Sequence, residues 1–331
     1  MEFPYPLLVC DIGGTNVRSA FLSERGASPH FLPPQLIASF PDFSSYADGI
    51  LADFGERPRS IIACGAGTVM NRHLQLTNAA WTVNGPQIAY CFGLSQGLLL
   101  NDFEAQALSL PIHRPEWLRV IGPSLPTGSG PRLILGPGTG LGVAALINDC
   151  GRYLSLASEA GHAEFAPLDD AERAIWAKLD PMHGRITGET LISGPGLARL
   201  HQARAQAFGF EAHALDAPAL IVAAKEDLSS QAAQTLRHFW RLVARLSGDL
   251  ALVFLARGGV TLSGGVLPRI TEFLDADMFR QNFEAKAPME HLLRSVPTQL
   301  LEAENAVLIG MAAIAAHPQN YIIDYPTRAW R

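Results

Sequence analysis

The feature that most constrains this chain is an apolar strand that ends in a glycine turn and continues as a second strand. Residues 7–10 are apolar and Asp11 follows them. Gly13-Gly14-Thr15 then separates this run from a second one at residues 17–22. A Gly-Gly-Thr turn lets backbone N–H groups approach an anion and places a hydroxyl beside them. Because a strand follows where a P-loop or dinucleotide fold has a helix, we expect a hairpin that holds nucleotide phosphates.

The same arrangement occurs a second time along the chain. An apolar run at residues 133–135 leads into the glycine-rich segment 136–142, and residues 143–147 follow as another apolar strand. Each hairpin opens its own series of strands and helices. One glycine run alone is a weak signal, but two similar hairpins predict a duplicated α/β architecture with a nucleotide held between the halves.

Composition excludes several classes of protein. With 331 residues the chain is long enough for two domains with substantial cores. A net charge of −6 does not favour binding to nucleic acid or to an anionic membrane. The only lysines are Lys178, Lys225 and Lys286, and the sequence contains no Gly-Lys-Ser/Thr. A P-loop enzyme is therefore excluded.

The cysteines and the apolar runs indicate the cellular compartment of the protein. Cysteines occur at positions 10, 64, 91 and 150 without any Cys-x-x-Cys pair, so we expect reduced thiols and neither a disulfide nor a zinc site. The first residues lack the features of a signal peptide. The longest apolar run, residues 306–316, is shorter than the roughly 20 residues of a membrane span. We expect a cytoplasmic protein.

Buried strands and amphipathic helices alternate through most of the chain, which is typical of an α/β fold. Apolar runs at 60–65 and 97–101 end in glycine or polar residues, where open α/β sheets bind ligands. A stripe of apolar residues at helical spacing over 236–250 predicts a long core helix closed by Gly258-Gly259. Residues 260–266 read as a strand with a Ser-Gly-Gly turn, either beside an adenosine or as an ordinary tight turn.

Asp102 is a candidate general base. It follows Asn101 at the expected end of a strand, in an apolar neighbourhood. A carboxylate there can accept the proton of a substrate hydroxyl while that oxygen attacks a phosphoryl group. The alternative is that Asp102 caps a helix beginning at Phe103.

Other polar residues are candidate sugar ligands. Glu159 and His162 could converge on one polyhydroxylated molecule, although a single histidine is more often a structural residue. Metal binding is disfavoured there, because no second histidine or cysteine lies at ligand spacing. Glu189 lies near an expected helix start, where a first-turn glutamate is also favoured by the helix dipole. Asn78 and Trp81 could offer an amide and a flat ring, with core packing as the alternative for Trp81.

The order of these motifs is more specific than any one of them. Along the chain they are residues 11–16, 76–78, 101–103, 138–142, 159–162, Glu189 ahead of 193–197, and 263–266. This order and spacing resemble the bacterial ATP-dependent glucokinase family over nearly the whole chain.

The resemblance implies a duplicated, actin-like ATPase (ribonuclease H-like) fold with an interdomain cleft. The expected small α/β domain covers residues 1–112 and is completed by a C-terminal helix at 305–331. The expected large α/β domain covers residues 113–304. The implied reaction transfers the γ-phosphate of MgATP to the 6-hydroxyl of glucose, giving glucose 6-phosphate and ADP. The implied assembly is a homodimer.

The resemblance also assigns roles to residues. Asp102 is similar to the general base of the family, and Asp11 to a residue that reaches Mg²⁺, directly or through water. The implied sugar ligands are Asn78, Asn101, Asp102, Glu159, His162 and Glu189. The implied ATP contacts are Cys10, Asp11, Ile12, Gly13, Gly14 and Thr15 in one phosphate loop, Gly138, Thr139 and Gly140 in the other, and Gly264 and Gly265 on the adenosine side.

Two segments depart from the family pattern. Residues 65–68 replace the usual Ala-Gly-Pro or Ala-Cys-Pro near the sugar, which leaves another hexose, mannose or fructose, as an alternative acceptor. Residues 305–307 replace a common Asn-Pro-Gly turn, with little expected effect on chemistry. The cysteine-rich zinc motif of the ROK sugar kinases is absent. A non-catalytic sugar sensor and an actin-like or chaperone ATPase are the alternatives from other classes, and polyphosphate is an alternative donor.

Overall fold

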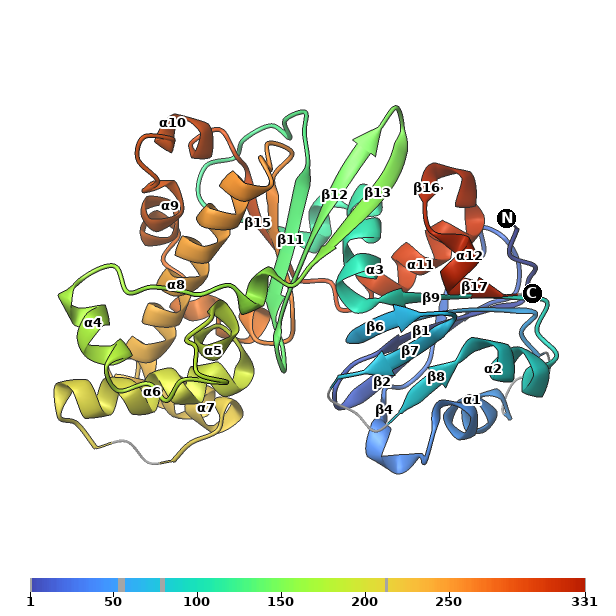
Figure 1. The fold of residues 1–331 in the computed structure, drawn as a ribbon, viewed down its shortest axis with the longest axis horizontal. Coiled ribbons are helices and arrows are strands. Elements are labelled where there is room, and N and C mark those ends of the chain that lie inside the picture. The colour runs from blue at the N-terminus through green and yellow to red at the C-terminus, as the bar shows by residue number, and fades with distance from the viewer. Residues whose placement is uncertain (1, 53–56, 78–80, 212–213, 331) are drawn as a thin grey trace. The chain divides into compact units, whose positions relative to one another are not determined.

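The computed structural model describes residues 2–52, 57–77, 81–211 and 214–330 (Figure 1). The chain forms two compact units. The first contains Met1–Arg114, Leu146–Ala157 and Ala303–Arg331, and the second contains Pro115–Ala145 and Ser158–Glu302. Residues 146–157, which we expected in the large domain, are thus grouped with the first unit. Residues 305–330 form several short elements, where we expected a single C-terminal helix over 305–331.

The first unit is built on a mixed sheet with the order β17-β9-β5-β1-β2-β3, and β4 also pairs with β2. Its strands are β1 (Leu7–Ile12), β2 (Asn16–Leu22), β3 (His30–Phe31), β4 (Gln35–Leu36), β5 (Ser60–Gly65), β9 (Gln96–Asn101) and β17 (Ala329–Trp330). Strands β1, β5 and β9 are parallel and almost wholly buried, as expected for parallel strands covered on both faces. The predicted apolar runs at 60–65 and 97–101 are therefore confirmed as core strands.

Helices and a small sheet complete the first unit. The helices are α1 (Phe43–Leu51), α2 (Gly85–Phe92), α3 (Asp102–Ser109), α11 (Ala306–Ala316) and α12 (Tyr325–Arg328). Strands β6 (Gly67–Met70), β7 (His73–Leu76) and β8 (Thr82–Asn84) form an antiparallel sheet. Helix α11 packs against α3 and β1, so a segment from the end of the chain covers the strand that carries Asp11.

The second sheet has the order β10-β15-β14-β11-β12-β13-β16. Its strands are β10 (Leu118–Val120), β11 (Arg132–Pro137), β12 (Leu141–Asp149), β13 (Arg152–Ser158), β14 (Val260–Leu262), β15 (Thr298–Leu301) and β16 (Tyr321–Ile322). The helices of the second unit are α4 (Asp170–Trp176), α5 (Gly188–Leu191), α6 (Gly194–Phe208), α7 (Ala217–Glu226), α8 (Gln231–Val253), α9 (Ala276–Glu284) and α10 (Glu290–Leu293). Helix α8 packs against α6, α7 and α9 at the centre of this unit (Figure 1).

Both sheets contain the same strand arrangement. In the first, β1 forms a hairpin with β2 and pairs on its other side with the parallel strand β5, which pairs with β9. In the second, β11 is joined to β12 by a short turn and pairs with the parallel strand β14, which pairs with β15. The two predicted glycine hairpins and the duplicated α/β architecture are confirmed.

The predicted core helix over residues 236–250 is confirmed, but its predicted end is wrong. Its apolar stripe is buried, and the helix ends at Val253, before Gly258. Leu255 adopts the left-handed conformation with φ 46°. Its N–H bonds to the Leu252 carbonyl, and the Ala256 N–H bonds to that of Ala251. This is a Schellman termination with leucine in the position that glycine usually occupies, so the glycine signal misplaced the end.

Within the described ranges, no helix combines the length and the apolar character needed to cross a membrane.

Candidate active site

The first hairpin turn is as tight as the sequence predicts. Strand β1 ends at Ile12 and β2 begins at Asn16, so Gly13-Gly14-Thr15 forms the turn. The Gly13 N–H donates to the Asn16 carbonyl at 2.9 Å. A Cβ atom on Gly13 would lie 3.1 Å from the same oxygen, which is tighter than ordinary side-chain contacts. The turn therefore brings backbone close to backbone and favours glycine.

Asp11 is buried, and both of its carboxylate oxygens have protein partners. Arg18 stands opposite it in the hairpin register and forms an ion pair with Oδ2. The same guanidinium donates to the Glu304 carbonyl at 2.6 Å. The Cys64 thiol donates to Oδ1 at 3.5 Å. Burial, followed by the negative charges of Asp11 and Asp102, raises the pKa of Cys64 well above its ordinary value, so the thiol keeps its proton.

The donors around Asp11 fit a magnesium ion held mainly by a nucleotide. Mg²⁺ in proteins keeps several waters and takes one or two carboxylates together with substrate phosphates. Asp11 supplies one carboxylate whose oxygens are already engaged, which favours contact through water. Among the described residues, no group of three or more histidine, cysteine, aspartate or glutamate side chains forms a metal site.

Cys10 and Ile12, expected in the same phosphate loop, have fully buried side chains. The Cys10 sulfur accepts a hydrogen bond from the Ser19 hydroxyl at 3.2 Å. Any contact of these two residues with a nucleotide would therefore come from the backbone.

Asp102 is the first residue of α3, and it is not the cap of that helix. The cap is Asn101, whose Oδ1 accepts from the N–H groups of Phe103 and Glu104 at 3.0 and 3.1 Å. The capping alternative for Asp102 is therefore wrong. A carboxylate in the first helical turn is stabilised by the helix dipole in its charged form. The Asn101 Nδ2 also donates to the Gly67 carbonyl at 3.1 Å, so its amide is held at both ends.

Asn78 and Trp81 are the other candidate sugar ligands in the first unit, and Asn78 lies outside the described residues. Trp81 is buried, and its Nε1 donates to the Phe40 carbonyl at 3.1 Å. Its ring packs against Phe43 and Tyr46. The core-packing interpretation of Trp81 is confirmed.

In the second unit, the structure brings the glycine loop and the Ser-Gly-Gly turn together. The Gly138 N–H donates to the Gly140 carbonyl at 2.8 Å and closes the loop. Gly264 has φ +89°, and a Cβ there would lie 2.4 Å from the Pro137 carbonyl oxygen. Only glycine fits this position, because its conformation is left-handed and a backbone atom blocks a side chain. The Gly194 N–H, at the start of α6, donates to the Gly138 carbonyl at 2.8 Å.

Glu189 supports the same loop. It lies in the first turn of α5, and its Oε2 accepts from the Leu141 N–H at 2.8 Å. A Cβ on Gly140 would come within 2.5 Å of that oxygen. The prediction that Glu189 lies in the first turn of a helix is thus confirmed. Its side chain also holds the loop ahead of β12 in place.

Glu159, His162 and Glu189 form one group, which we call the His162 cluster. The Nε2 atom of His162 lies 3.7 Å from Glu159 Oε2, and its Nδ1 lies 4.0 Å from Glu189 Oε1. The side chains of Glu159 and His162 are 90% and 55% exposed, and that of Glu189 is 23% exposed. The cluster therefore presents an imidazole and two carboxylates that can accept hydrogen bonds from hydroxyl groups.

The sequence interpretation missed Arg18 and Cys64. The Arg18 partner could have been found, because a tight turn in which Gly13 faces Asn16 places residue 11 opposite residue 18. The Cys64 contact depends on the parallel pairing of β1 with β5, which no local pattern specifies.

Comparison with known proteins points to one family. A family model described as "Glucokinase" matches residues 8–318. The glucokinase of Rhizobium meliloti (strain 1021) is 36% identical over 331 residues, covering 100% of this chain and 98% of that protein. The crystal structure of a glucokinase from an Antarctic psychrotroph has a TM-score of 0.82 at 29% identity, covering 95% of this chain and all of that one. A glucokinase of Balamuthia mandrillaris in complex with glucose has a TM-score of 0.79 at 21% identity, covering 93% of each chain.

Proposed function

The chain belongs to the glucokinase family, and we propose that it transfers the γ-phosphate of MgATP to the 6-hydroxyl of glucose with Asp102 as general base. The family match over residues 8–318 supports ATP-dependent hexose kinase activity. The duplicated sheets agree with the actin-like ATPase fold of such kinases. The single observation that supports the assignment of the base is the position of Asp102 in the first turn of α3, directly after the buried strand β9.

Asp102 acts on the attacking hydroxyl. Phosphoryl transfer asks a protein mainly for positioning and charge stabilisation. The 6-oxygen forms a bond to the γ-phosphorus, the bond from phosphorus to the β,γ-bridging oxygen breaks, and the hydroxyl proton passes to the Asp102 carboxylate. The products are glucose 6-phosphate and ADP. Because Asn101 caps the helix, the Asp102 carboxylate is not needed for that task.

The His162 cluster binds the sugar in this proposal. The carboxylates of Glu159 and Glu189 accept hydrogen bonds from sugar hydroxyls, and His162 adds an imidazole nitrogen. Hydrogen bonds to charged groups contribute about 1.5–3 kcal/mol each. Asn101 contributes its second amide N–H, beyond the one that bonds to Gly67. Asn78 is the remaining proposed sugar ligand.

The two glycine turns bind the phosphates. The turn bonds engage the N–H groups of Gly13 and Gly138. We therefore assign the phosphate contacts to the N–H groups of Gly14, Thr15 and Thr139. Gly264 and Gly265 lie on the adenosine side in this proposal, and nothing lies within 4 Å of a Cβ position at Gly265, which leaves space for a ring. Asp11 would hold Mg²⁺, directly or through water, and the ion would neutralise phosphate charge.

The cellular setting belongs to the same proposal. We place the enzyme in the cytoplasm, as a homodimer that feeds glucose into glycolysis. All four cysteines are unpaired in the structure, which agrees with a reducing compartment. The homodimer rests on the family resemblance alone.

A second acceptor remains a candidate because of the segment that departs from the family pattern. A Cβ on Gly67 would lie 1.9 Å from the Gln75 carbonyl oxygen, so glycine is required where this segment packs against β7. The Gly67 carbonyl in turn bonds to Asn101. This segment thus positions a proposed sugar ligand, and a changed geometry here would favour mannose or fructose.

The test is release of ADP from MgATP with glucose, mannose, fructose, N-acetylglucosamine or no sugar. Strong stimulation by glucose alone is the expected result. Stimulation by another hexose would retain the mechanism and change the acceptor. ATP turnover that no sugar affects would indicate an ATPase, and the absence of turnover with retained glucose binding would indicate a sugar sensor. A parallel series with polyphosphate in place of ATP identifies the donor.

A further inference from the structure

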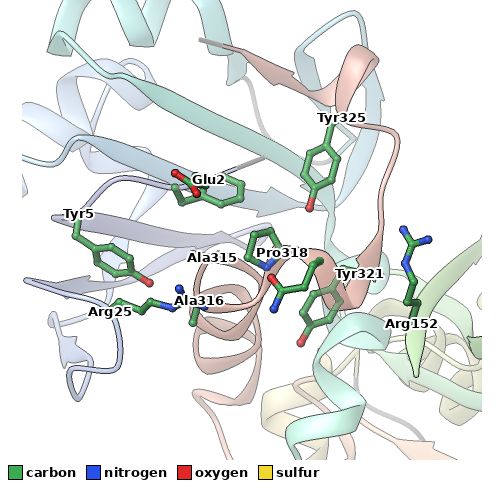
Figure 2. A pocket seen from close by; sticks show the side chains of 11 residues that line it. Glu2, Tyr5, Arg25, Arg152, Ala315, Ala316, Pro318, Tyr321 and Tyr325 are labelled. Carbon is green, nitrogen blue, oxygen red and sulfur yellow. The ribbon is translucent and has the colours of Figure 1, made fainter. Parts of the chain in front are cut away.

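A cavity in the first unit has no part in the proposed reaction. It has a volume of about 510 Å³, within the usual range for sites that bind small molecules. It lies where the N-terminal segment meets the end of α11 and the segment that follows it (Figure 2). Its polar and aromatic lining includes Tyr5, Arg25, Arg152, Tyr321 and Tyr325. None of them belongs to the candidate active site.

The charge of this cavity favours an anion. Two guanidinium groups, Arg25 and Arg152, line it together with a single carboxylate, Glu2. Figure 2 shows Arg25 and Arg152 on opposite sides of the cavity, with Pro318 between them. Arg25 is oriented by a contact of its Nη2 with His317 Nδ1 at 3.4 Å. Guanidinium groups bind phosphate and carboxylate with two parallel hydrogen bonds, so this lining favours a ligand that carries one of these two groups.

Two of the tyrosines that line the cavity, Tyr5 and Tyr325, have buried hydroxyl groups that are available to a ligand. The hydroxyl oxygens of Tyr5 and Tyr325 are buried, and neither has a hydrogen-bond partner among the described residues. Burial raises the pKa of Tyr321 and Tyr325 to about 12, so both phenols keep their protons and can donate. Buried polar atoms without partners are rare in native proteins and call for a missing water, ion or ligand.

Aromatic and apolar side chains form the rest of the cavity lining. The Tyr321 ring is buried and packs against the ring of Tyr153 at a centroid distance of 6.0 Å, which holds it in place. Phe3, Ala315, Ala316 and Pro318 add apolar surface. Such surfaces bind the flat or cyclic part of a ligand.

We propose that this cavity binds a small organic anion, with its phosphate or carboxylate on Arg25 or Arg152 and its ring against the tyrosines. The Tyr5 and Tyr325 hydroxyls hydrogen-bond to the polar atoms of that ligand. The site is separate from the residues proposed for glucose and ATP, so this inference stands independently of the kinase activity.

Calorimetric titration of the full chain tests the proposal. The probes are phenyl phosphate and benzoate, which combine a ring with an anion, and inorganic phosphate and phenol, which each supply one part. We expect phenyl phosphate or benzoate to bind at least about tenfold more tightly than either part. Absence of heat for both ring-bearing anions up to about 10 mM would overturn the proposal.

Variants locate the bound probe. Arg152→Gln should weaken binding by about tenfold or more, because it removes a charged hydrogen-bond donor. Arg173→Gln is the matched control, since Arg173 is 58% exposed and forms an ion pair with Asp170, three residues earlier. It should change affinity less than about twofold. Arg25→Gln is measured in parallel, and equal affinity in wild type and in both arginine variants would place the probe elsewhere and contradict the site.

Tyr325→Phe separates a binding role from a structural one. The change removes only a buried hydroxyl that has no partner among the described residues. It should leave Tm unchanged or raise it, while weakening the binding of phenyl phosphate several-fold. A lower Tm with unchanged affinity would show that the hydroxyl serves the fold and would remove it from the proposed site.

Discussion

The carboxylate of Asp11 has a partner for each oxygen, Arg18 across the hairpin and the Cys64 thiol on the neighbouring strand. The sequence places Asp11 at the end of a strand, but it does not show these partners. Arg18 belongs to the same hairpin and follows from its register. Cys64 comes from a strand more than fifty residues away. Local chemistry could therefore be predicted, while the electrostatic surroundings depend on how β1 and β5 pair.

A substitution at Glu159 tests whether the His162 cluster binds the sugar. Its side chain is 90% exposed, so Glu159→Gln removes a charge without disturbing the core. Losing a charged hydrogen bond of about 1.5–3 kcal/mol should raise KM for glucose by roughly tenfold or more. KM for ATP and Tm should stay unchanged.

The matched control for this prediction is Glu164→Gln. Glu164 is also exposed and belongs to the second unit, where it pairs with Arg185. This variant should retain the wild-type KM for both substrates. If Glu159→Gln also retains the wild-type KM for glucose, Glu159 does not bind the sugar.

Among the elements, the two glycine hairpins and the core helix α8 could be predicted, because their patterns are local. The end of α8 could not, since Leu255 occupies a left-handed position that sequence rules reserve for glycine or asparagine. The start of α3 was placed one residue late for a related reason. Asn101 and Asp102 are both good caps, and only the observed bonds from Phe103 and Glu104 show that Asn101 is the cap.

In the loop that carries Glu159 and His162, the backbone at Gly161 lies very close to the backbone at Leu141, and this contact can be tested. A Cβ on Gly161 would lie 2.3 Å from the Leu141 carbonyl oxygen, and backbone atoms cannot move aside easily. Gly161→Ala should therefore lower the free energy of unfolding by about 1–3 kcal/mol. Urea denaturation followed by circular dichroism measures the change.

Gly138→Ala is the comparison for this prediction. Nothing lies within 4 Å of a Cβ at Gly138, and its φ is not in the left-handed region. Its free energy of unfolding should stay within about 0.5 kcal/mol of wild type. Equal stability of the two variants would show that the loop does not require the close approach at Gly161.

For the whole molecule, the duplicated α/β architecture follows from the repeated hairpins, and the structure confirms it. The division into units could be predicted less well. Residues 146–157, which include the end of β12 and all of β13 but its last residue, are grouped by their contacts with the first unit. The C-terminal segment forms α11, α12 and short strands that complete the first unit. Contacts between distant parts of the chain decide such boundaries, and the amino-acid composition does not predict these contacts.

Stability of the whole protein should depend on a buried ionic cluster in the second unit. Burial lowers the pKa of His238, and the charge of Arg204 adds to that effect, while Glu172 opposes it. His238 Nε2 lies 3.6 Å from Glu172 Oε1, and Arg241 and Arg245 also pair with Glu172. The folded protein therefore holds His238 neutral at pH values where the unfolded chain binds a proton.

The sign of the pH effect follows from this lowered pKa. The contribution of His238 is complete above about pH 6.5 and is lost as the pH falls toward the folded pKa. His238→Gln should make the free energy of unfolding depend less steeply on pH between 6.5 and 5, by at most about 1.4 kcal/mol per pH unit. His291→Gln, at an exposed histidine, should keep the wild-type slope. An unchanged slope in His238→Gln would contradict the assignment.

The proposed mechanism rests on the Asp102 carboxylate, and turnover of Asp102→Asn with glucose and MgATP decides whether it is the general base. Asp277→Asn is the matched control, because Asp277 is an exposed aspartate in the first turn of α9. We predict that Asp102→Asn lowers kcat by about 10²–10⁴-fold with an unchanged Tm, while Asp277→Asn keeps wild-type turnover. A folded Asp102→Asn enzyme whose kcat stays within a few-fold of wild type would contradict the mechanism.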